Sequence, residues 1–422
     1  MHQRREDSSF LVRVLFGIPI DNRYPCADVP LMIRRNLTGP LQALAEKMPV
    51  VAVTGPRQSG KTTLCRAAFP DKRYVSLEPL DLRDYARDDP RGFLEEHVEG
   101  AVIDEAQRAP GLFSYLQAEV DERPEPGRFI LTGSQHFGLN ESITQSLAGR
   151  VALLTLLPPS LDELSLFPNS PLDLLSTLWT GAYPRIFDQE LEAGRWLGDY
   201  VTTYVQRDVR QVLNVTDLDA FTQFLRLAAG STGTELHLSR IGADAGVTHN
   251  TVRSWISVLE ASFILFRIPA WHRNLRKRSV KAPKLHFFDT GLVCQLLGIQ
   301  DAEQLRHHPL RGAIFESWVA SEIYKARGHR GFSPNLFHFR DNKGLEVDVV
   351  VDTGPGVIGV ECKAGATIAT GSMAGLEAVG KLVSTHHPHL DQTLCLVYGG
   401  ASAQRRKGIE VLPWSSLPTL NW

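Results

Sequence analysis

The chain has 422 residues, of which 43% are hydrophobic and 22% are charged, and its formal net charge is −2. This composition is that of an ordinary soluble protein with roughly two to four domains, and it confines any nucleic-acid site to a local basic patch. No apolar run approaches the roughly 18 residues that a bilayer-spanning helix needs, so no membrane partner is expected.

The N-terminus and the cysteines indicate a cellular location. Glu6 and Asp7 interrupt the N-terminal apolar patch and no cleavage site follows it, which argues against a signal peptide. The five cysteines include no C-x-x-C pair, which is typical of the reducing cytosol and argues against zinc. We therefore expect a cytoplasmic protein. Residues 1–31 are expected to form a poorly ordered extension, and Met32 is a candidate translation start because helical spacing begins there.

The first motif follows a strand predicted over residues 50–53. Gly55, four intervening residues and then Gly60, Lys61 and Thr62 form the pattern G-x-x-x-x-G-K-[ST]. The glycines let backbone N–H groups face one point, and the helix that follows directs its positive dipole end there. We expect ATP to bind here, with Lys61 bridging the β- and γ-phosphates and Thr62 holding Mg²⁺. The predicted nucleotide-binding residues are Gly55, Pro56, Arg57, Gln58, Ser59, Gly60, Lys61, Thr62 and Thr63.

A second motif, over residues 100–107, places Asp104 and Glu105 after a short apolar run. A buried parallel strand delivers carboxylates to the carboxyl edge of its sheet in this way. We expect Asp104 to hold the Mg²⁺ shell and Glu105 to polarise the attacking water. The alternative, in which the two acids only cap the next helix, is disfavoured by their position downstream of a phosphate loop.

Another apolar strand, over residues 128–131, ends in polar residues. Thr132 and Ser134 are candidates for sensing the γ-phosphate and placing the water, with Gln135 as a third; a strand-to-helix cap is the alternative. Arg150 precedes a strand predicted over residues 151–156. It is either an arginine finger that reaches the nucleotide of a neighbouring subunit or a surface charge.

Strands and helices alternate over residues 48–157, which predicts a parallel sheet covered by helices. Residues 157–160 mark a boundary, after which residues 161–215 have a helical, amphipathic pattern typical of a lid or bundle. Arg207 and Arg210 could face a nucleotide or a neighbouring subunit, although a solvated helix face is the simpler interpretation.

Residues 218–290 have the pattern of a winged helix. Its third predicted helix turns Val252, Ile256 and Leu259 inward and leaves polar residues outward at its start, where base or phosphate contacts usually lie. Winged helices also bind proteins, so both kinds of partner stay open. The outward residues proposed to contact DNA are His249, Asn250 and Arg253.

A dense basic segment follows the predicted wing strand at residues 263–268. Its charges would neutralise several phosphates and release counterions, although a solvated loop or a protein-binding patch is also possible. Asp289 ends the next apolar strand, and we assign it no chemistry. The predicted DNA-contacting residues of this segment are Arg273, Arg276, Lys277, Arg278, Lys281 and Lys284.

The last third of the chain is predicted to form an α/β domain. Alternation along a hairpin places Glu361 and Lys363 on one face with Asp348 opposite them, an arrangement that suits Mg²⁺ beside a base. This D-x₁₂-E-x-K pattern resembles the PD-(D/E)xK restriction-endonuclease-like core, with Glu316 as a possible fourth acid from a helix. The alternatives are a nuclease-like domain that only binds, or paired surface charges.

The motifs together resemble a known family. Their order is similar to the AAA+ class of P-loop ATPases, and most closely to the prokaryotic family that joins an AAA-type ATPase domain to a C-terminal DUF4143 region. The resemblance implies an ATP- and Mg²⁺-dependent enzyme that works as a homo-oligomer, as a hexameric ring if Arg150 acts in trans. The motifs that carry it are GPRQSGKTT (55–63), VIDEAQ (102–107), LTGSQ (131–135), SLAGR (146–150), YVQRDV (204–209), RNLRKRSVKAPKLHFFDTGL (273–292), GAIFESWVASEI (312–323) and EVDVVVD with GVECKAG (346–365).

We predict an α/β chain in which a P-loop sheet and helical lid precede a winged helix and a restriction-endonuclease-like domain. The expected function is ATP-driven remodelling of, or translocation on, duplex or branched DNA in repair or recombination. An ATP-gated nuclease and a STAND-like nucleotide switch are the alternatives. The predicted domains are an extension (1–31), the ATPase (32–157), the lid (158–216), the winged helix with its basic segment (217–300) and the nuclease-like domain (301–422).

Overall fold

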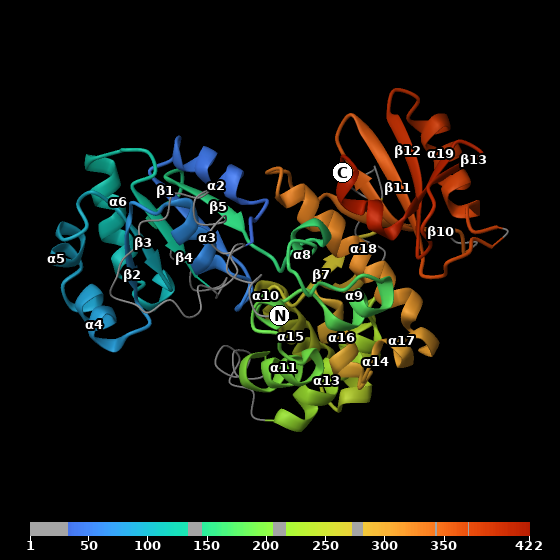
Figure 1. Cartoon of the computed structure of the whole chain (residues 1–422), viewed down its shortest axis with the longest axis horizontal. Helices are drawn as coiled ribbons and strands as arrows, with labels where there is room; N and C mark the ends of the chain where they lie inside the picture. Colours follow the sequence, from blue (N-terminus) through green and yellow to red (C-terminus); the bar gives the residue numbers. More distant parts are fainter. Residues whose placement is uncertain (1–32, 134–145, 206–216, 272–281, 342–343, 370) are drawn as a thin grey trace, which may run out of the picture. The chain divides into compact units, whose positions relative to one another are not determined.

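The computed structural model describes residues 33–133, 146–205, 217–271, 282–341, 344–369 and 371–422. Five parallel strands form the first sheet in the order β2-β3-β4-β1-β5 (Figure 1). Because β4 lies between β1 and β3, the carboxyl ends of these three strands meet at one edge, where ligands bind in such sheets. The strands are β1 (Val50–Thr54), β2 (Arg73–Ser76), β3 (Ala101–Asp104), β4 (Phe129–Thr132) and β5 (Val151–Thr155).

Helices cover both faces of this sheet, which explains why β1 is buried along its whole length. Val50 and Ala52 pack in one apolar cluster with residues of α4, α5 and α6, whereas Val51 and Val53 pack in another with α2 and α3. The α6 helix is not among the elements predicted above. The helices are α2 (Thr38–Ala45), α3 (Lys61–Ala68), α4 (Leu80–Asp88), α5 (Pro90–Glu95), η1 (Ala106–Arg108) and α6 (Leu112–Glu122).

The segment after β5 is helical, as its amphipathic pattern predicts. Aromatic rings hold its second half together, with centroids of Tyr183, Trp196 and Tyr200 between 4.7 and 5.2 Å apart. The ring of Tyr204 continues the stack at 5.0 Å from Tyr200. The elements are α8 (Leu161–Leu164), α9 (Leu174–Thr180), α10 (Pro184–Asp188), α11 (Ala193–Tyr200) and the π-helix η2 (Val201–Val205).

Three helices and a three-stranded antiparallel sheet follow, in the α-β-α-α-β-β order of a winged helix. The helix α15 buries Val252, Ile256 and Leu259, as predicted. Asp289, left without a role above, caps α16 by accepting a hydrogen bond from the Leu292 N–H. The elements are α13 (Leu218–Gly230), β6 (Thr234–Glu235), α14 (Leu238–Ala245), α15 (His249–Ala261), β7 (Leu265–Ile268), β8 (Lys284–Phe287), α16 (Thr290–Leu297) and α17 (Ala302–His307).

The remaining elements form an α/β domain around a mixed six-stranded sheet in the order β13-β14-β12-β11-β10-β9 (Figure 1). The strands β11, β12 and β14 are parallel to one another, and the other pairs are antiparallel. Among the described residues, no helix combines the length and apolar composition needed to cross a membrane. The elements are α18 (Arg311–Gly328), β9 (Leu336–Arg340), β10 (Glu346–Asp352), β11 (Gly356–Lys363), α19 (Ala374–His386), β12 (Asp391–Tyr398), β13 (Gln404–Arg406), β14 (Ile409–Pro413) and η4 (Trp414–Thr419).

Candidate functional site

The loop between β1 and α3 curls tightly, because three of its residues have positive φ angles. Gly55, Gln58 and Gly60 have φ angles of 143°, 63° and 90°. A Cβ atom on Gly55 would lie 2.1 Å from the carbonyl oxygen of Leu156, so only glycine fits there. Backbone concavities of this kind bind anions, and the loop therefore fits the phosphates of a nucleotide.

Lys61 is the first residue of α3, and its side chain is buried. Its Nζ donates hydrogen bonds to the carbonyl oxygens of Gly55, at 3.0 Å, and Pro56, at 2.7 Å. Burial lowers the pKa of Lys61 to about 8, although the nearby carboxylates of Glu105 and Asp104 raise it. Because its partners are neutral carbonyls, this ammonium can exchange them for phosphate oxygens, which are stronger acceptors.

The carboxylate of Asp104 gathers side chains from the neighbouring elements. It accepts hydrogen bonds from Thr62 Oγ1 (3.1 Å to each oxygen), from Tyr74 Oη (2.9 Å) and from Thr132 Oγ1. The structure thus brings Thr62 and Asp104, the residues of the two motifs that are predicted to hold Mg²⁺, into contact. Tyr74, on β2, belongs to the site although no motif contains it.

Glu105 has a backbone conformation that is rare outside glycine, with a φ angle of 55°. Such backbone strain is concentrated at functional sites, where the surrounding structure maintains it. The Glu105 Oε2 atom accepts a hydrogen bond of 2.5 Å from Gln107 Nε2. A carboxylate held one residue beyond Asp104 is suited to polarise a water molecule beside the phosphates.

Two further arginines form defined contacts in the ATPase domain. Arg150 is one-third exposed and forms a two-point ion pair with Asp121, including an Nη2–Oδ2 distance of 2.8 Å. Arg35, which no motif predicts, is buried and donates to the carbonyl oxygens of Ser59 (2.8 Å) and Leu157 (2.7 Å). It thereby ties the phosphate loop to the boundary that follows β5.

Three of the predicted DNA-contacting residues lie where the sequence pattern predicts them. His249, Asn250 and Arg253 are exposed in the first turns of α15, which begins after the capping side chain of Thr248. Five of the basic-segment residues and several other candidates lie outside the described residues. These are Arg273, Arg276, Lys277, Arg278 and Lys281, together with Ser134, Gln135, Arg207 and Arg210.

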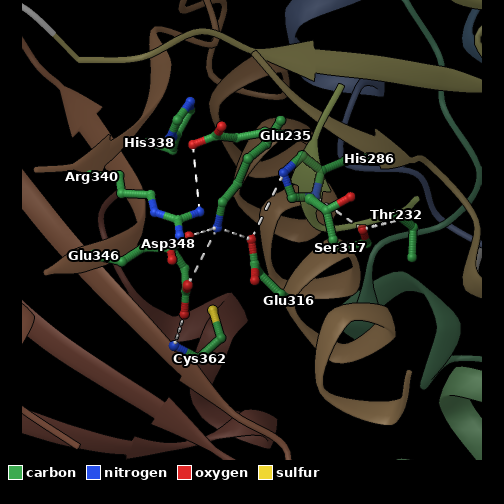
Figure 2. Close-up of polar contacts among 12 residues, drawn as sticks. Thr232, Glu235, His286, Glu316, Ser317, His338, Arg340, Glu346, Asp348 and Cys362 are labelled. Atoms are coloured by element: carbon green, nitrogen blue, oxygen red, sulfur yellow. Dashed lines mark hydrogen bonds and ion pairs between the residues drawn. The ribbon is translucent and has the colours of Figure 1, made fainter. Parts of the chain in front are cut away.

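Lys284 corrects the prediction for the basic segment. Its side chain is only 3% exposed, because the residue begins the strand β8 and points into the protein. Its Nζ lies 2.8 Å from Glu316 Oε1, 2.5 Å from Glu346 Oε1 and 3.5 Å from Asp348 Oδ1. Figure 2 shows these three carboxylates converging from α18 and β10. Lys284 is therefore not a surface contact for a DNA phosphate.

The predicted nuclease-like residues come together around the same point. Asp348 Oδ2 accepts a hydrogen bond of 2.8 Å from the Cys362 N–H, and Lys363 Nζ lies 2.6 Å from Glu361 Oε1. Burial and the neighbouring Asp348 raise the pKa of Glu361 to about 7. The carboxyl groups of Glu316, Asp348 and Glu361 are buried here together with Lys284, whereas Glu346 and Lys363 are partly exposed at the edge of the site. Glu346 was not predicted.

A layer of polar contacts surrounds Ser317, the residue after Glu316 on α18. The hydroxyl of Ser317 lies 2.9 Å from His286 Nδ1 and 2.7 Å from Thr232 Oγ1 (Figure 2). Burial and the charge of Lys284 lower the pKa of His286 well below its usual range, so this imidazole is neutral. Lys284 and His286 alternate along β8 onto the same face, and α18 packs against that face.

Comparisons with known proteins agree with this arrangement. Residues 47–165 match the family described as "AAA domain", residues 172–303 match "Domain of unknown function (DUF8612)" and residues 311–417 match "Domain of unknown function (DUF4143)". Uncharacterized proteins of Mycobacterium bovis and Mycobacterium tuberculosis are each 30% identical to this chain over 348 residues, or 80% of this chain and 76% of theirs. The chain belongs to the AAA-type P-loop ATPases with a C-terminal DUF4143 domain.

Several solved structures match parts of this chain with low structural similarity. The Walker-type ATPase of Pyrococcus abyssi is 14% identical, with a TM-score of 0.45, and the match covers 65% of this chain and 99% of that one. RuvB of Thermotoga maritima is 18% identical, with a TM-score of 0.28 and coverage of 56% and 90%. AMPPCP-bound DnaA from Aquifex aeolicus is 14% identical, with a TM-score of 0.28 and coverage of 53% and 85%.

The nucleotide site lies within one family match, whereas the site around Lys284 spans two. Lys61, Thr62 and Asp104 all belong to the AAA domain. Lys284 lies in the DUF8612 match, whereas the carboxylates that it contacts lie in the DUF4143 match. The second site is therefore built by two regions of this AAA-DUF4143 chain.

Proposed function

We propose that the chain hydrolyses ATP with Mg²⁺ and couples hydrolysis to work on DNA. The convergence of Lys61, Thr62 and Asp104 below the curled loop supports nucleotide hydrolysis. Thr62 and Asp104 would hold the magnesium ion, which neutralises charge on the phosphates when it is bound. These groups recur in P-loop ATPases, whose chemistry depends on positioning and electrostatic stabilisation.

Each residue of the nucleotide site would have a separate role in hydrolysis. Lys61 would stabilise the charge that develops on the transferred phosphoryl group, and Glu105 would orient and polarise the attacking water. Thr132, already bonded to Asp104, would report the state of the γ-phosphate together with Ser134. The strained conformation of Glu105 supports its role, because such strain is concentrated at functional sites.

Arg150 supports a working homo-oligomer. In the single chain its partly exposed side chain pairs with Asp121. An arginine in such a position can reach the nucleotide of a neighbouring subunit, where it would stabilise transition-state charge. A ring, hexameric by analogy with the AAA+ class, would provide that neighbour.

The exposed start of α15 carries the DNA part of the proposal. His249, Asn250 and Arg253 stand on the third helix of the winged helix, the element that enters a groove in proteins of this type. The basic residues between β7 and β8 would add phosphate contacts that do not depend on base sequence. Duplex or branched DNA, remodelled during repair or recombination, is therefore the proposed substrate.

Measurement of ATP turnover tests this function. The purified chain is assayed at fixed salt alone and with single-stranded, duplex, forked and four-way-junction DNA, because phosphate-driven affinity changes strongly with salt. We expect stimulation by at least one DNA and less stimulation in Arg253→Ala, with basal turnover unchanged. Equal turnover under all conditions would contradict the DNA proposal and favour the alternative of a STAND-like nucleotide switch.

A further inference from the structure

Lys284 occupies the centre of the nuclease-like site. It comes from β8 of the winged-helix sheet, whereas its three carboxylate partners come from α18 and β10 of the DUF4143 domain (Figure 2). Lys284, Glu316 and Asp348 are buried, and Glu346 is partly exposed, so solvent weakens the contacts to Glu316 and Asp348 only a little. A single side chain from another region thus supplies the positive charge of the site.

The site has more acceptor capacity than Lys284 uses. Glu361 is buried, and its Oε2 atom has no hydrogen-bond partner, while its Oε1 atom contacts Lys363. Val349 of β10 and Val360 of β11 are paired across the two antiparallel strands. Asp348 precedes Val349 and Glu361 follows Val360, so these two acids are neighbours. A buried carboxylate oxygen without a partner is the type of ligand that hard divalent cations take.

The position of the ammonium is incompatible with such a cation. Mg²⁺ requires oxygen ligands at about 2.0–2.1 Å in an octahedral arrangement. Lys284 Nζ already lies within hydrogen-bond distance of Glu316 and Glu346, between the groups that would be the ligands. Among the described residues, no group of three or more histidine, cysteine or acidic side chains is arranged to hold a metal ion.

We propose that Lys284 is the built-in cation of this site, where it takes the place of a divalent metal. The chain as folded then binds no Mg²⁺ or Mn²⁺ among Glu316, Asp348 and Glu361, and it does not cleave DNA. The same contact joins β8 to α18 and β10. An ATP-gated nuclease would first have to withdraw Lys284, and replacing this lysine with a neutral residue creates a divalent-cation site.

Mn²⁺ binding tests this proposal. The full chain, without nucleotide, is titrated with Mn²⁺, and the bound ions are counted by electron paramagnetic resonance. We expect Lys284→Met to gain one tightly bound ion relative to the wild type, and Asp348→Asn in the Lys284→Met background to lose it. The melting temperature of Lys284→Met should rise with Mn²⁺, whereas that of the wild type should not.

Lys325 provides a matched control. It is a buried lysine on α18, and among the described residues the one carboxylate within ion-pair distance of it is that of Glu322; it also donates to the carbonyl oxygen of Pro159 at 3.0 Å. Lys325→Met therefore removes a buried ammonium without uncovering several carboxylates, and we expect it to gain no ion. This separates the effect of the carboxylate site from a general effect of losing a buried charge.

Two results would overturn the proposal. A folded Lys284→Met chain that gains no Mn²⁺ would show that Lys284 does not stand in for a metal. A wild-type chain that loses a tightly bound ion on Asp348→Asn would show that the site already binds metal. The comparison of the wild type with Asp348→Asn keeps Lys284 in both chains, so it shows whether the site binds metal even if Lys284→Met does not fold.

Discussion

Two buried lysines contact different partners in this molecule. Lys61 donates to two neutral carbonyl oxygens of its own loop, and burial lowers its pKa. Lys284 lies among three carboxylates, and although burial alone would lower its pKa, Glu316, Asp348 and Glu346 raise it well above the usual range. The first ammonium is available for an anionic ligand, whereas the second is already neutralised by the protein.

This difference shows how one residue type serves binding in one place and structure in another. A lysine that contacts carbonyls gains little from them and can exchange them for phosphate oxygens. A lysine among buried carboxylates cannot leave without exposing several uncompensated charges, which is costly in a protein interior. The partners, and not the lysine itself, decide which site can bind a substrate.

The largest expected effect concerns catalysis at the nucleotide site, where Lys61 lies. Glu105→Gln keeps the size of the side chain but removes its ability to take a proton, so kcat for ATP should fall about 10²–10⁴-fold. Nucleotide affinity should stay unchanged, because Lys61 and Thr62 are intact. Glu125→Gln, at an exposed acid that pairs with Arg123, is the control. Equal losses in the two variants would show that Glu105 has no role in the chemistry.

The second prediction compares the lysines directly through stability. Lys284→Met leaves carboxylates without a counterion, and removing one partner of a buried ion pair typically costs about 3–5 kcal/mol of unfolding free energy. Lys61→Met leaves only carbonyls and relieves the burial of a charge, so we expect no loss. Urea unfolding measures both. Similar destabilisation in the two variants would contradict the contrast between the sites.

The third prediction concerns pH. Since the pKa of Lys61 is about 8, its proton is lost as the pH rises through this value, and ATP affinity should then fall by about tenfold per pH unit. The folded pKa lies below the ordinary value of 10.5, so the unfolded chain holds this proton more tightly. The Lys61 contribution to unfolding free energy should therefore rise between these two pH values.

Lys61→Arg is the control for the pH prediction, because a guanidinium keeps its charge throughout this range. Residue 61 should then add no pH dependence to ATP affinity between about pH 8 and pH 10. The same pH dependence in the wild type and in Lys61→Arg would assign the titration to another group.

The smallest expected effect is at α15. Arg253→Ala removes one exposed charge, so the slope of log affinity for DNA against log salt should decrease by about one, with a similar loss on every sequence. Fluorescence anisotropy at several salt concentrations measures the slope. Ser257→Ala, on the same helix, is the control, because its hydroxyl only bonds the carbonyl oxygen of Arg253. An unchanged slope in Arg253→Ala would remove α15 from the DNA interface.

The sequence predicts which residues gather at the phosphate loop because they belong to contiguous motifs. Lys61 and Thr62 follow a glycine loop, and Asp104 ends a strand, so the parallel sheet alone brings them together. Tyr74 could not be found in this way, since an aromatic residue in a strand looks like core. The helix α6 had a readable apolar spacing at Leu112, Phe113, Leu116 and Val120, but it was not predicted.

Lys284 shows where sequence reasoning fails. The sequence groups Lys284 with the basic residues before it, because a sequence displays only how closely charged residues follow one another along the chain. The start of β8 at this residue, and the three acids from distant segments, are consequences of the tertiary fold. Asp348, Glu361 and Lys363 were predicted to share a face, since strand alternation is a local property, but the lysine between the acids was not.

The most direct test counts the Mn²⁺ ions bound by the wild-type chain in the presence of a saturating, non-hydrolysable ATP analogue. The account predicts one tightly bound ion per chain, held at the nucleotide site and lost in Thr62→Ala. A second tight ion that disappears in Asp348→Asn would contradict the claim that the carboxylate site is closed by Lys284. The absence of any nucleotide-dependent ion would contradict the assignment of Thr62 and Asp104.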